Sequence, residues 1–585
     1  MNDLKRLYGY MGPYRKDMAL GMLLVMIECT FEMIIPVLMS DIIDKGVAQG
    51  DVACIWRTGF AMAACALMAL GTGLLYARYA ARAAYGFGAR IRRAEYAKVQ
   101  SYAFGNLDHF ETSSLITRMT TDVTVVQNAI NGGFRPMVRG PVMLALGVGL
   151  SLMMNARLAL VFLICTPVLG VVLFFVTRRV APMYTRLQQA MDHLNTVVQE
   201  CLTAIRAVKA FVRGEYEEEK FQAVNTELMD VSMTTFRTAV LNLPAFQLTM
   251  YAAMVAILWF GGNMILQGSL TVGRLTSFLS YVLQVMNSLM MISNVFLLMT
   301  RSLASAHRIA AVLDEQVELA NPAHPVTEIP DGGVAFEHVS FKYHPDAAEY
   351  ALAGIDLVIQ PGETVGILGG TGSAKSTLVQ LIPRLYDATE GRVLVGGRDV
   401  REYDLAALRD AVGIVLQKNV LFSGTVRENL LWGNPGASDE ELWAACRAAC
   451  ADEFLQRMPG GLDADLGQGG VNVSGGQKQR LTIARALLRK PKILILDDST
   501  SAVDTATDAK IRAAFREKLP GTTRIIIAQR ISSVQDADRI LVLDNGRIDG
   551  LGTHEELLAT NKIYQEVYTS QTQGGGDFDK QGGEG

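Results

Sequence analysis

Six long apolar stretches in the first half of this 585-residue chain constrain its fold more than any other feature. Each reaches the roughly 20 residues that a helix needs to cross the hydrocarbon core of a bilayer. Buried helices of a large soluble domain are rarely so uniformly apolar. The sequence therefore predicts six membrane-spanning helices, at residues 17–43, 56–80, 134–154, 157–178, 240–266 and 272–300.

The segments that connect these stretches alternate between short and long. The two long ones, residues 78–135 and 178–237, are polar, favour helix and carry many arginines and lysines. By the positive-inside rule they lie in the cytoplasm, together with both chain ends. At the N-terminus, Leu7 and Met11 recur at helical spacing among basic residues, which favours a helix on the membrane surface over a frayed polar end.

Composition supports one membrane part and one soluble part. Half of the residues are hydrophobic although 19% are charged. The net charge of −4 argues against a nucleic-acid-binding protein, which would carry a basic field. The seven cysteines are scattered and form no CxxC pair, so we expect free thiols rather than disulfides or a metal site.

Polar side chains within the predicted spans are candidates for function, because ionisable groups are costly in a bilayer. Glu28 and Glu32 lie four residues apart and share one face of the first span, Arg139 lies in the third, and Gln284 and Asn287 give the sixth a polar stripe. One hypothesis is a cavity for small amphipathic or cationic molecules. The alternative is hydrogen bonding between helices and ordinary packing.

After residue 320 the pattern changes. Residues 321–333 are marked by Pro and Gly as a linker, and the chain then alternates strand-like and helical segments, as an α/β domain does. The strand-like run 363–368 leads into a glycine-rich loop and a helix. This is the P-loop pattern, in which backbone N–H groups cradle phosphates, the lysine reaches the β- and γ-phosphates and the serine holds Mg²⁺. Its residues are Gly369, Gly370, Thr371, Gly372, Ser373, Ala374, Lys375, Ser376 and Thr377.

One position departs from the usual P-loop. Ala374 stands where a glycine normally precedes the lysine. An alanine fits if the backbone there already has helical angles, so the sequence predicts that phosphate binding is kept.

Two further motifs accompany the P-loop. The apolar run 493–496 ends in Asp497 and Asp498, the pattern of a Walker B carboxylate that organises Mg²⁺. Between the two motifs, Ser474, Gly475, Gly476 and Gln477 open a helix rich in Arg and Ala. With this signature the sequence resembles the ATP-binding-cassette (ABC) family over essentially the whole chain. It looks like a bacterial exporter-type half-transporter with the type IV membrane fold.

The resemblance implies roles for further residues. Tyr343 matches the aromatic residue that stacks on adenine, and Gln417 matches the residue that touches Mg²⁺ and links to the membrane domain. Residues 501–504 match the loop that crosses the cassette dimer interface. Residues 108–122 and 204–211 resemble the two coupling helices that dock on cassettes. The implied Mg²⁺ ligands are Ser376, Gln417 and Asp497.

Two residues break the catalytic pattern of the family. Asp498 stands where a glutamate positions the attacking water, and Gln529 replaces the switch histidine. A carboxylate that retreats by about 1 Å can lose about 100-fold in rate, and glutamine cannot carry an imidazolium charge. Both changes predict a site that binds ATP and hydrolyses it poorly. The intact signature at Ser474 to Gln477 then implies a heterodimer in which this chain completes the active site of a partner with the consensus residues.

The sequence thus predicts a polytopic α-helical membrane domain, with six transmembrane helices and long cytoplasmic extensions, fused to an α/β P-loop ATP-binding cassette. The predicted function is ATP- and Mg²⁺-dependent export of drug- or lipid-like amphipathic molecules, as in a multidrug transporter of the bacterial cytoplasmic membrane. Import of a metal chelate by the same fold, or a cassette-gated channel or regulator, are the alternatives. The expected boundaries are 1–320 for the membrane domain, 321–333 for the linker, 334–570 for the cassette and 571–585 for a disordered tail.

Overall fold

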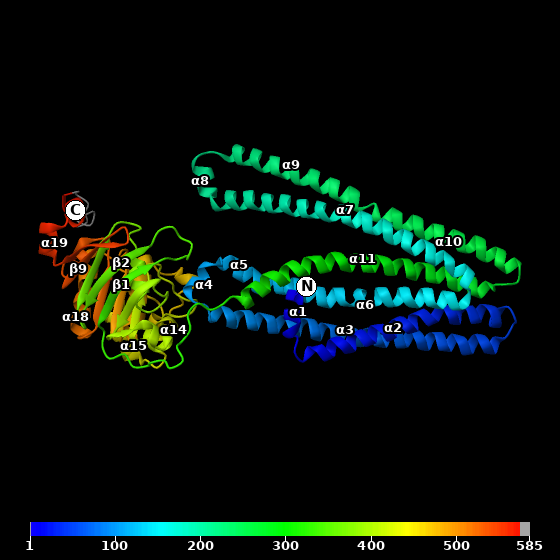
Figure 1. The fold of residues 1–585 in the computed structure, drawn as a ribbon, viewed down its shortest axis with the longest axis horizontal. Coiled ribbons are helices and arrows are strands. Elements are labelled where there is room, and N and C mark those ends of the chain that lie inside the picture. The colour runs from blue at the N-terminus through cyan, green and yellow to red at the C-terminus, as the bar shows by residue number, and fades with distance from the viewer. Residues whose placement is uncertain (1, 574–585) are drawn as a thin grey trace. The chain divides into compact units, whose positions relative to one another are not determined.

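The computed structural model describes residues 2–573, which form two compact units. The membrane unit contains the chain up to Gln100 and Glu111–Glu315. The cassette unit contains Ser101–Phe110 and the chain from Gln316 onward. A short piece of the first long connecting segment therefore belongs to the cassette unit (Figure 1).

The predicted number of spans is confirmed. Over the part of the chain that the structure describes, six helical stretches are long and apolar enough to cross a membrane. The protein is accordingly a multi-pass membrane protein. The six stretches are Tyr14–Val47, Val52–Gln100, Thr112–Met154, Ala156–Thr203, Gly214–Leu266 and Val272–Ser293.

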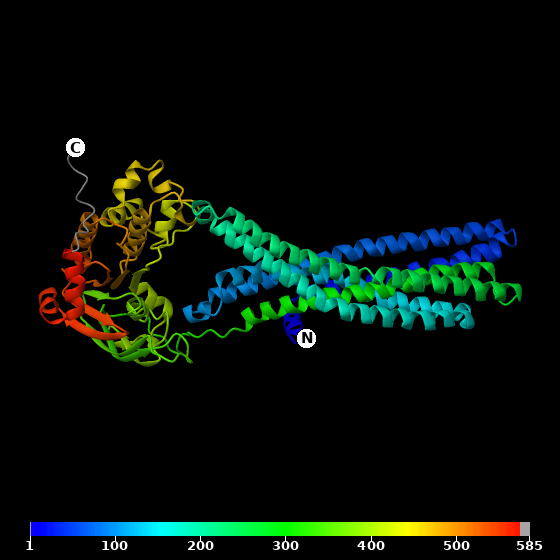
Figure 2. The same cartoon turned by 90° about the horizontal axis from the view of Figure 1, so that it is seen from above.

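Helices of the membrane unit continue well beyond the apolar runs. Helix α3 has 49 residues and α7 has 48, so each exceeds the roughly 20 residues that a bilayer requires. Both views show α7 and α9 side by side along their length (Figures 1 and 2). The helices of this unit are α1 (Asn2–Gly9), α2 (Tyr14–Asp41), α3 (Val52–Gln100), α5 (Thr112–Thr117), α6 (Val123–Met154), α7 (Ala156–Thr203), α8 (Ile205–Ala210), α9 (Gly214–Ala239), α10 (Asn242–Leu266) and α11 (Val272–Asp314), with π-helical turns at Ile42–Val47 and Arg118–Asp122. Helix α4 (Phe104–Asp108) lies in the short piece that belongs to the cassette unit.

The core of the membrane unit joins α2, α7 and α11. The rings of Phe162 and Phe278 stack with their centres 6.0 Å apart. The buried Tyr281 hydroxyl donates a hydrogen bond of 2.8 Å to the carbonyl oxygen of Met33. At Gly147 on α6, a Cβ atom would lie 2.6 Å from the side chain of Val285. A small residue therefore allows α6 and α11 to approach closely, as is common between membrane helices.

The cassette unit is built on two sheets. A four-stranded antiparallel sheet has the order β2-β1-β4-β5, and a six-stranded sheet has the order β10-β9-β3-β8-β7-β6. In the larger sheet, β9, β3, β8, β7 and β6 are parallel to one another. The strands are β1 (Val334–Phe341), β2 (Leu352–Ile359), β3 (Thr364–Gly369), β4 (Glu390–Val395), β5 (Arg398–Asp399), β6 (Val412–Val415), β7 (Ile493–Asp497), β8 (Thr523–Ile527), β9 (Arg539–Asp544) and β10 (Arg547–Gly552).

Helices complete the cassette and confirm the predicted α/β class. The strands that bear the predicted motifs, β3, β8, β7 and β6, are neighbours in one sheet. Their carboxyl ends meet at one edge, where open α/β sheets bind ligands. The helices are α12 (Lys375–Gln380), α13 (Leu405–Ala411), α14 (Val426–Leu431), α15 (Asp439–Ala448), α16 (Asp452–Arg457), α17 (Gly475–Leu488), α18 (Thr505–Lys518), α19 (His554–Thr560) and α20 (Lys562–Gln573).

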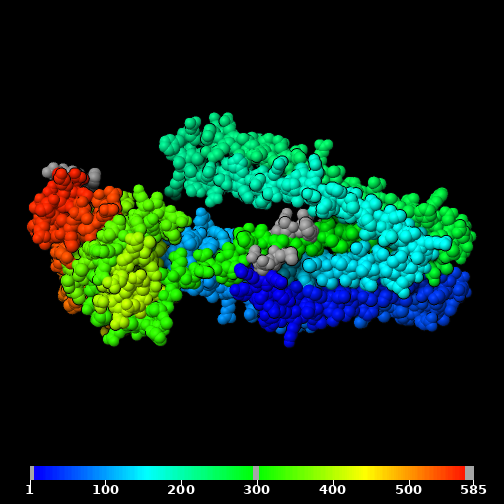
Figure 3. Space-filling model, in the orientation of Figure 1, coloured from blue at the N-terminus to red at the C-terminus, as the bar shows by residue number. Residues whose placement is uncertain are grey.

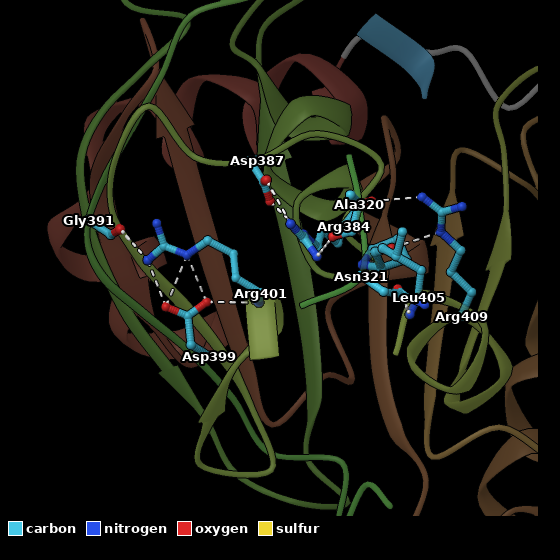
Figure 4. A network of polar contacts seen from close by, with 10 residues as sticks. Ala320, Asn321, Arg384, Asp387, Gly391, Asp399, Arg401, Leu405 and Arg409 are labelled. Carbon is cyan, nitrogen blue, oxygen red and sulfur yellow. Dashed lines mark hydrogen bonds and ion pairs between the residues drawn. The ribbon is translucent and has the colours of Figure 1, made fainter. Parts of the chain in front are cut away.

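The segment predicted as a linker is held on the cassette by hydrogen bonds (Figure 4). The Asn321 amide donates to a carboxylate oxygen of Asp404 at 2.6 Å and accepts from the Leu405 backbone N–H at 2.9 Å. Further on, Val326 pairs with the chain beside Tyr403. These contacts place Asn321 and Val326 against the residues at the start of α13. The predicted linker is therefore packed on the cassette ahead of β1.

The end of the chain differs in part from the predicted tail. Helix α20 continues through Gln573, so the first residues assigned to a disordered tail are helical. The remainder of that segment, residues 574–585, lies outside the described residues.

Candidate nucleotide site and membrane charge cluster

The P-loop connects β3 to α12. Gly369 ends the strand, and a Cβ atom there would lie 2.2 Å from the carbonyl oxygen of Leu543 on the neighbouring strand, so only glycine fits. The Lys375 ammonium donates to the carbonyl oxygens of Gly369 and Gly370 at 2.9 and 2.7 Å. Burial lowers the pKa of Lys375, and the carboxylates of Asp497 and Asp498 oppose that shift. The loop therefore places a cation among backbone groups, as phosphate binding requires.

The backbone at Ala374 is not helical, which corrects the premise of the sequence analysis. Its φ of 66° and ψ of 26° lie in the left-handed region. A Cβ atom costs about 1–2 kcal/mol in this conformation, whereas glycine adopts it freely. The alanine is thus accommodated with strain, not because the residue already belongs to α12.

Asp497 ends β7, whose residues are all buried. Its carboxylate accepts a hydrogen bond from the Ser376 hydroxyl, while burial raises the pKa of Asp497. A serine hydroxyl and a carboxylate that meet beside the phosphate loop are oxygen ligands of the kind that Mg²⁺ prefers. The structure therefore brings together two of the three predicted Mg²⁺ ligands, and the chemistry of both suits that ion.

The signature residues cap α17. The Ser474 hydroxyl accepts from the Gln477 N–H at 3.3 Å, and the Gln477 side chain accepts from the Ser474 N–H at 2.9 Å. A Cβ atom at Gly476 would lie 2.6 Å from the carbonyl oxygen of Ala502, so the helix start packs closely on the loop after β7. Ser474 and Gly475 are exposed. The N-terminal end of α17 thus lies at the surface, which suits an anionic ligand.

Comparison with known families assigns both units. The family described as ABC transporter transmembrane region matches residues 18–289, and the family described as ABC transporter matches residues 352–501. The ABC transporter ATP-binding protein YfiB of Bacillus subtilis (strain 168) is 37% identical over 568 residues, covering 97% of this chain and 98% of that protein. The chain belongs to the ABC transporter family.

Other relatives of this ABC transporter indicate an exporter. An ATP-dependent lipid A-core flippase of Desulfotalea psychrophila is 30% identical over 572 residues, covering 97% of this chain and 99% of that protein. A bacterial Atm1-family ABC exporter, solved with ATP bound, superimposes with a TM-score of 0.79 at 25% identity, covering 96% of this chain and 99% of that one. The chain is therefore an ABC exporter half-transporter, with one membrane domain fused to one ATP-binding domain.

The two residues that depart from the ABC pattern touch each other. The Gln529 amide donates a hydrogen bond of 2.8 Å to a carboxylate oxygen of Asp498. The side chain of Gln417, which follows β6, also donates to this carboxylate. Burial raises the pKa of Asp498, and both hydrogen bonds oppose that shift. The sequence predicted all three residues for the site but did not predict that two amides hold the one carboxylate.

Gln571 is a residue of this site that the sequence analysis missed. From α20 its amide donates to the carbonyl oxygen of Gln529 at 2.8 Å and its oxygen accepts from the Ile531 N–H at 2.9 Å. Gln571 therefore fixes the backbone on both sides of Arg530. A lone glutamine before a Gly-rich tail gives no sequence signal, because its partners are 40 and 42 residues away.

Tyr343, which the sequence analysis predicts to contact adenine, lies beside the P-loop helix. Its hydroxyl is 2.8 Å from the Thr377 hydroxyl, and its ring is 44% exposed. Tyr386, which the sequence analysis did not single out, packs edge-to-face on Tyr343 with ring centres 5.4 Å apart. The Tyr386 hydroxyl donates to Asp108 at 2.7 Å. Asp108, the first residue of the first predicted coupling segment and a part of the cassette unit, thus contacts the aromatic pair of Tyr343 and Tyr386 through the Tyr386 hydroxyl.

The second predicted coupling segment forms the exposed end of a helical pair. Helix α8 contains no buried residue, and the following Phe211 and Val212 are 79% and 87% exposed. Two neighbouring apolar side chains at the end of a helical hairpin are typical of an interaction site.

The acidic residues of the first span are paired within the membrane unit. Arg139 on α6 donates to Glu28 at 2.9 Å and to Glu32 at 2.8 Å. Arg135 forms a second ion pair with Glu28, and its guanidinium lies 5.6 Å from the ring centre of Tyr76. Because two arginines neutralise the two carboxylates, this cluster offers no net negative charge to a cation.

The other polar residues predicted for a cavity lie on α11. Gln284 is half-buried and Asn287 is exposed. The Gln284 side-chain oxygen is buried and has no hydrogen-bond partner among the residues that the structure describes. A substrate cavity that includes these residues remains a prediction.

The strained backbone at Ala374 leads to the first testable prediction. Ala374→Gly relieves about 1–2 kcal/mol of left-handed strain and increases unfolded-chain entropy by up to about 1 kcal/mol. We expect an unchanged or slightly raised melting temperature in detergent and undiminished ATP binding. Ala374→Val should lower both, because β-branched residues resist this conformation. A loss of stability in Ala374→Gly would contradict the backbone assignment.

A second prediction concerns Gln571. Gln571→Ala leaves the Gln529 carbonyl and the Ile531 N–H without these partners, which costs about 1–2 kcal/mol. Thermal unfolding should show a fall of about 2–6 °C for the cassette transition. The matched control is Ser570→Ala, an exposed position on the same helix. Equal melting temperatures for both variants would show that the Gln571 contacts add no stability.

A third prediction tests the charge cluster. Arg139→Ala leaves buried Glu28 with one partner fewer and Glu32 with none of its arginine contacts, which costs about 3–5 kcal/mol for a buried pair. We expect the melting temperature of the purified protein to fall by more than about 6 °C. Arg157→Ala, at an exposed position, serves as the control. Similar values for the two variants would argue against a buried ion pair.

Proposed function

We propose that this chain is the subunit with the weaker ATP site in a heterodimeric, ATP-driven exporter of small amphipathic molecules. The observation that carries the proposal is the hydrogen bond of 2.8 Å between Gln529 and Asp498, the two residues that replace the catalytic histidine and glutamate of the family.

The Asp498–Gln529 pair is poorly suited to activating water. The aspartate is one methylene shorter than glutamate, and a reacting group misplaced by about 1 Å can lose about 100-fold in rate. Gln417 and Gln529 already donate to the carboxylate. Glutamine also brings no positive charge toward the γ-phosphate. ATP and Mg²⁺ would be held by Lys375, Ser376 and Asp497, while hydrolysis at this site is slow.

The intact signature supports a partner of a different sequence. Ser474 and Gly475 are exposed at the start of α17, where they are free to complete a nucleotide site on another chain. A homodimer would contain two sites with the Asp498–Gln529 pair. A partner with glutamate and histidine at these positions would instead use the signature of this chain in a fully active site.

Surface features of each unit support dimerisation. The exposed end formed by α8, Phe211 and Val212 combines apolar side chains with the positive charges of Arg206 and Lys209. The cassette carries a cavity of about 270 Å³ beside β6, the strand that precedes Gln417. The stacked rings of Phe422 and Trp432 line this cavity. We propose that the α8 end of each subunit docks on the cassette of the other, with both cassettes on the cytoplasmic side.

The substrate class rests on the relatives and on the membrane unit. Proteins named lipid A-core flippases are among the similar sequences, and such a substrate is amphipathic. In the membrane unit, Met250, Met254 and Met290 pack at the margin of the core. Flexible thioether side chains adapt to varied apolar ligands. An importer would move substrate in the opposite direction, and a gated channel or regulator would not pump substrate at all. Measuring the direction of ATP-driven substrate flux in sealed vesicles of known orientation therefore tests the export assignment.

The heterodimer proposal gives a fourth prediction. The chain purified alone and reconstituted in liposomes should hydrolyse ATP slowly. The double variant Asp498→Glu with Gln529→His should raise kcat by about 100-fold, because it restores both the reach of the carboxylate and the imidazole. The two single changes together should account for less than the effect of the double change on the activation free energy, because the two side chains contact each other and their effects are not additive.

The control for the gain in kcat is the same double change combined with Lys375→Ala, which should abolish it. Brisk, transport-coupled ATP hydrolysis by the unmodified chain alone would overturn the weak-site proposal. A double variant as slow as the unmodified chain would show that other features limit hydrolysis.

A further inference from the structure

The membrane unit contains a cavity of about 220 Å³ that belongs to neither the nucleotide site nor the charge cluster. Its walls come from α1, α2, α3, α6 and α11, and they are almost wholly apolar. The α1–α2 segment lies on the surface of this unit, in dark blue in Figure 3. Side chains that line the cavity include Leu7, Met18, Phe87, Ala129, Phe134 and Met299.

The depth of the cavity in the membrane follows from the predicted spans. Met18, Phe134 and Met299 each lie within two residues of the cytoplasmic end of a predicted span. Ala129, Phe87 and Val126 lie five to eight residues outside the spans, so the cavity extends from the start of the acyl chains through the level of the headgroups of the cytoplasmic leaflet. Behind it, Leu7 and Met11 pack with Phe87 and Val126 in one buried cluster, so the wall is fixed by tertiary contacts.

The mouth of the cavity combines exposed apolar surface with positive charge. Tyr8 and Met137 line the cavity and are 44% and 49% exposed. The Arg15 guanidinium lies 4.8 Å from the centre of the Tyr8 ring and donates to the Tyr8 carbonyl oxygen at 3.2 Å. Lys5 and Lys16 are exposed on the same N-terminal segment. Aromatic rings beside basic side chains are typical of protein surfaces at the membrane interface.

We propose that this cavity binds one acyl chain of an anionic phospholipid from the cytoplasmic leaflet, with the lipid phosphate beside Arg15. The chain fills the space between α1, α3, α6 and α11, and the charged headgroup stays at the interface.

Physical arguments favour this occupant over water or a bulky drug. Water is disfavoured because an ordered water needs two to four polar partners, which these walls do not supply. Drug-sized ligands occupy about 300–1,000 Å³, so a cavity of about 220 Å³ suits a single narrow chain better. An acyl chain gains little free energy by moving from lipid to protein, since both are apolar. Headgroup charge therefore decides which lipid binds, and Arg15 favours an anionic one.

The test uses the full-length protein in nanodiscs that contain a phospholipid with a photoactivatable diazirine on one acyl chain. Phosphatidylglycerol and phosphatidylcholine versions are compared, and labelled peptides are identified by mass spectrometry. We expect labelling of peptides that contain Phe134, Met137 or Met299, stronger with phosphatidylglycerol than with phosphatidylcholine. Labels confined to outward-facing surfaces such as that around Trp259, which is 70% exposed, would overturn the proposal.

Two variants separate the chain site from the headgroup site. Ala129→Phe places a ring in the cavity and should reduce labelling there to background, whereas the matched Ala64→Phe, at an exposed position of α3, should not. Arg15→Gln should reduce phosphatidylglycerol labelling to the phosphatidylcholine level. Unchanged labelling in Ala129→Phe would refute the acyl-chain site, and an unchanged lipid preference in Arg15→Gln would refute the headgroup assignment. If Ala129→Phe fails to fold, the Arg15 comparison and the labelled peptides still decide the question.

Discussion

Hydrogen bonding among the parallel strands β3, β8, β7 and β6 brings together the P-loop, the Walker B carboxylates, Gln417 and Gln529. Each strand ends at the same edge of the sheet and delivers one functional segment there: the P-loop, Gln529, Asp497 with Asp498, and Gln417. The spacing between neighbouring strands is about 4.8 Å, so side chains that follow adjacent strands can meet. Without this register, motifs that lie far apart in the chain would not form one site.

The contacts at that edge show that Asp498 and Gln529, the two residues that depart from the family pattern, act on each other. Taken separately, an aspartate for a glutamate and a glutamine for a histidine are two substitutions. In the structure they form one hydrogen-bonded pair, held from behind by Gln571. The Asp498 carboxylate is thus held by the side-chain amides of Gln417 and Gln529, and a histidine at position 529 has no amide group to donate. This hydrogen-bonded pair is the observation on which the proposal of a weaker ATP site rests.

The membrane unit handles its charges by pairing them. Glu28, Glu32, Arg135 and Arg139 form a cluster whose formal charges cancel. A charged group in a bilayer is tolerated when a partner of opposite sign is within contact distance. The residues that looked most like a cation-binding site therefore serve first to join α2 to α6. Exposed positive charge lies instead on the N-terminal segment around Arg15, where we propose that a lipid phosphate binds.

The sequence by itself determined the class of protein, the number of spans and the identity of the nucleotide motifs. Helix length against bilayer thickness and the phosphate chemistry of a P-loop are local properties, and spacing along the chain reveals them. Tertiary structure alone decided the left-handed backbone at Ala374, the arginine partners of Glu28 and Glu32, and the roles of Gln571 and Tyr386. Each of these depends on a neighbour that is remote in sequence or on a φ angle that residue type does not dictate. Such contacts form only when strands and helices pack against one another, so local sequence patterns do not predict them.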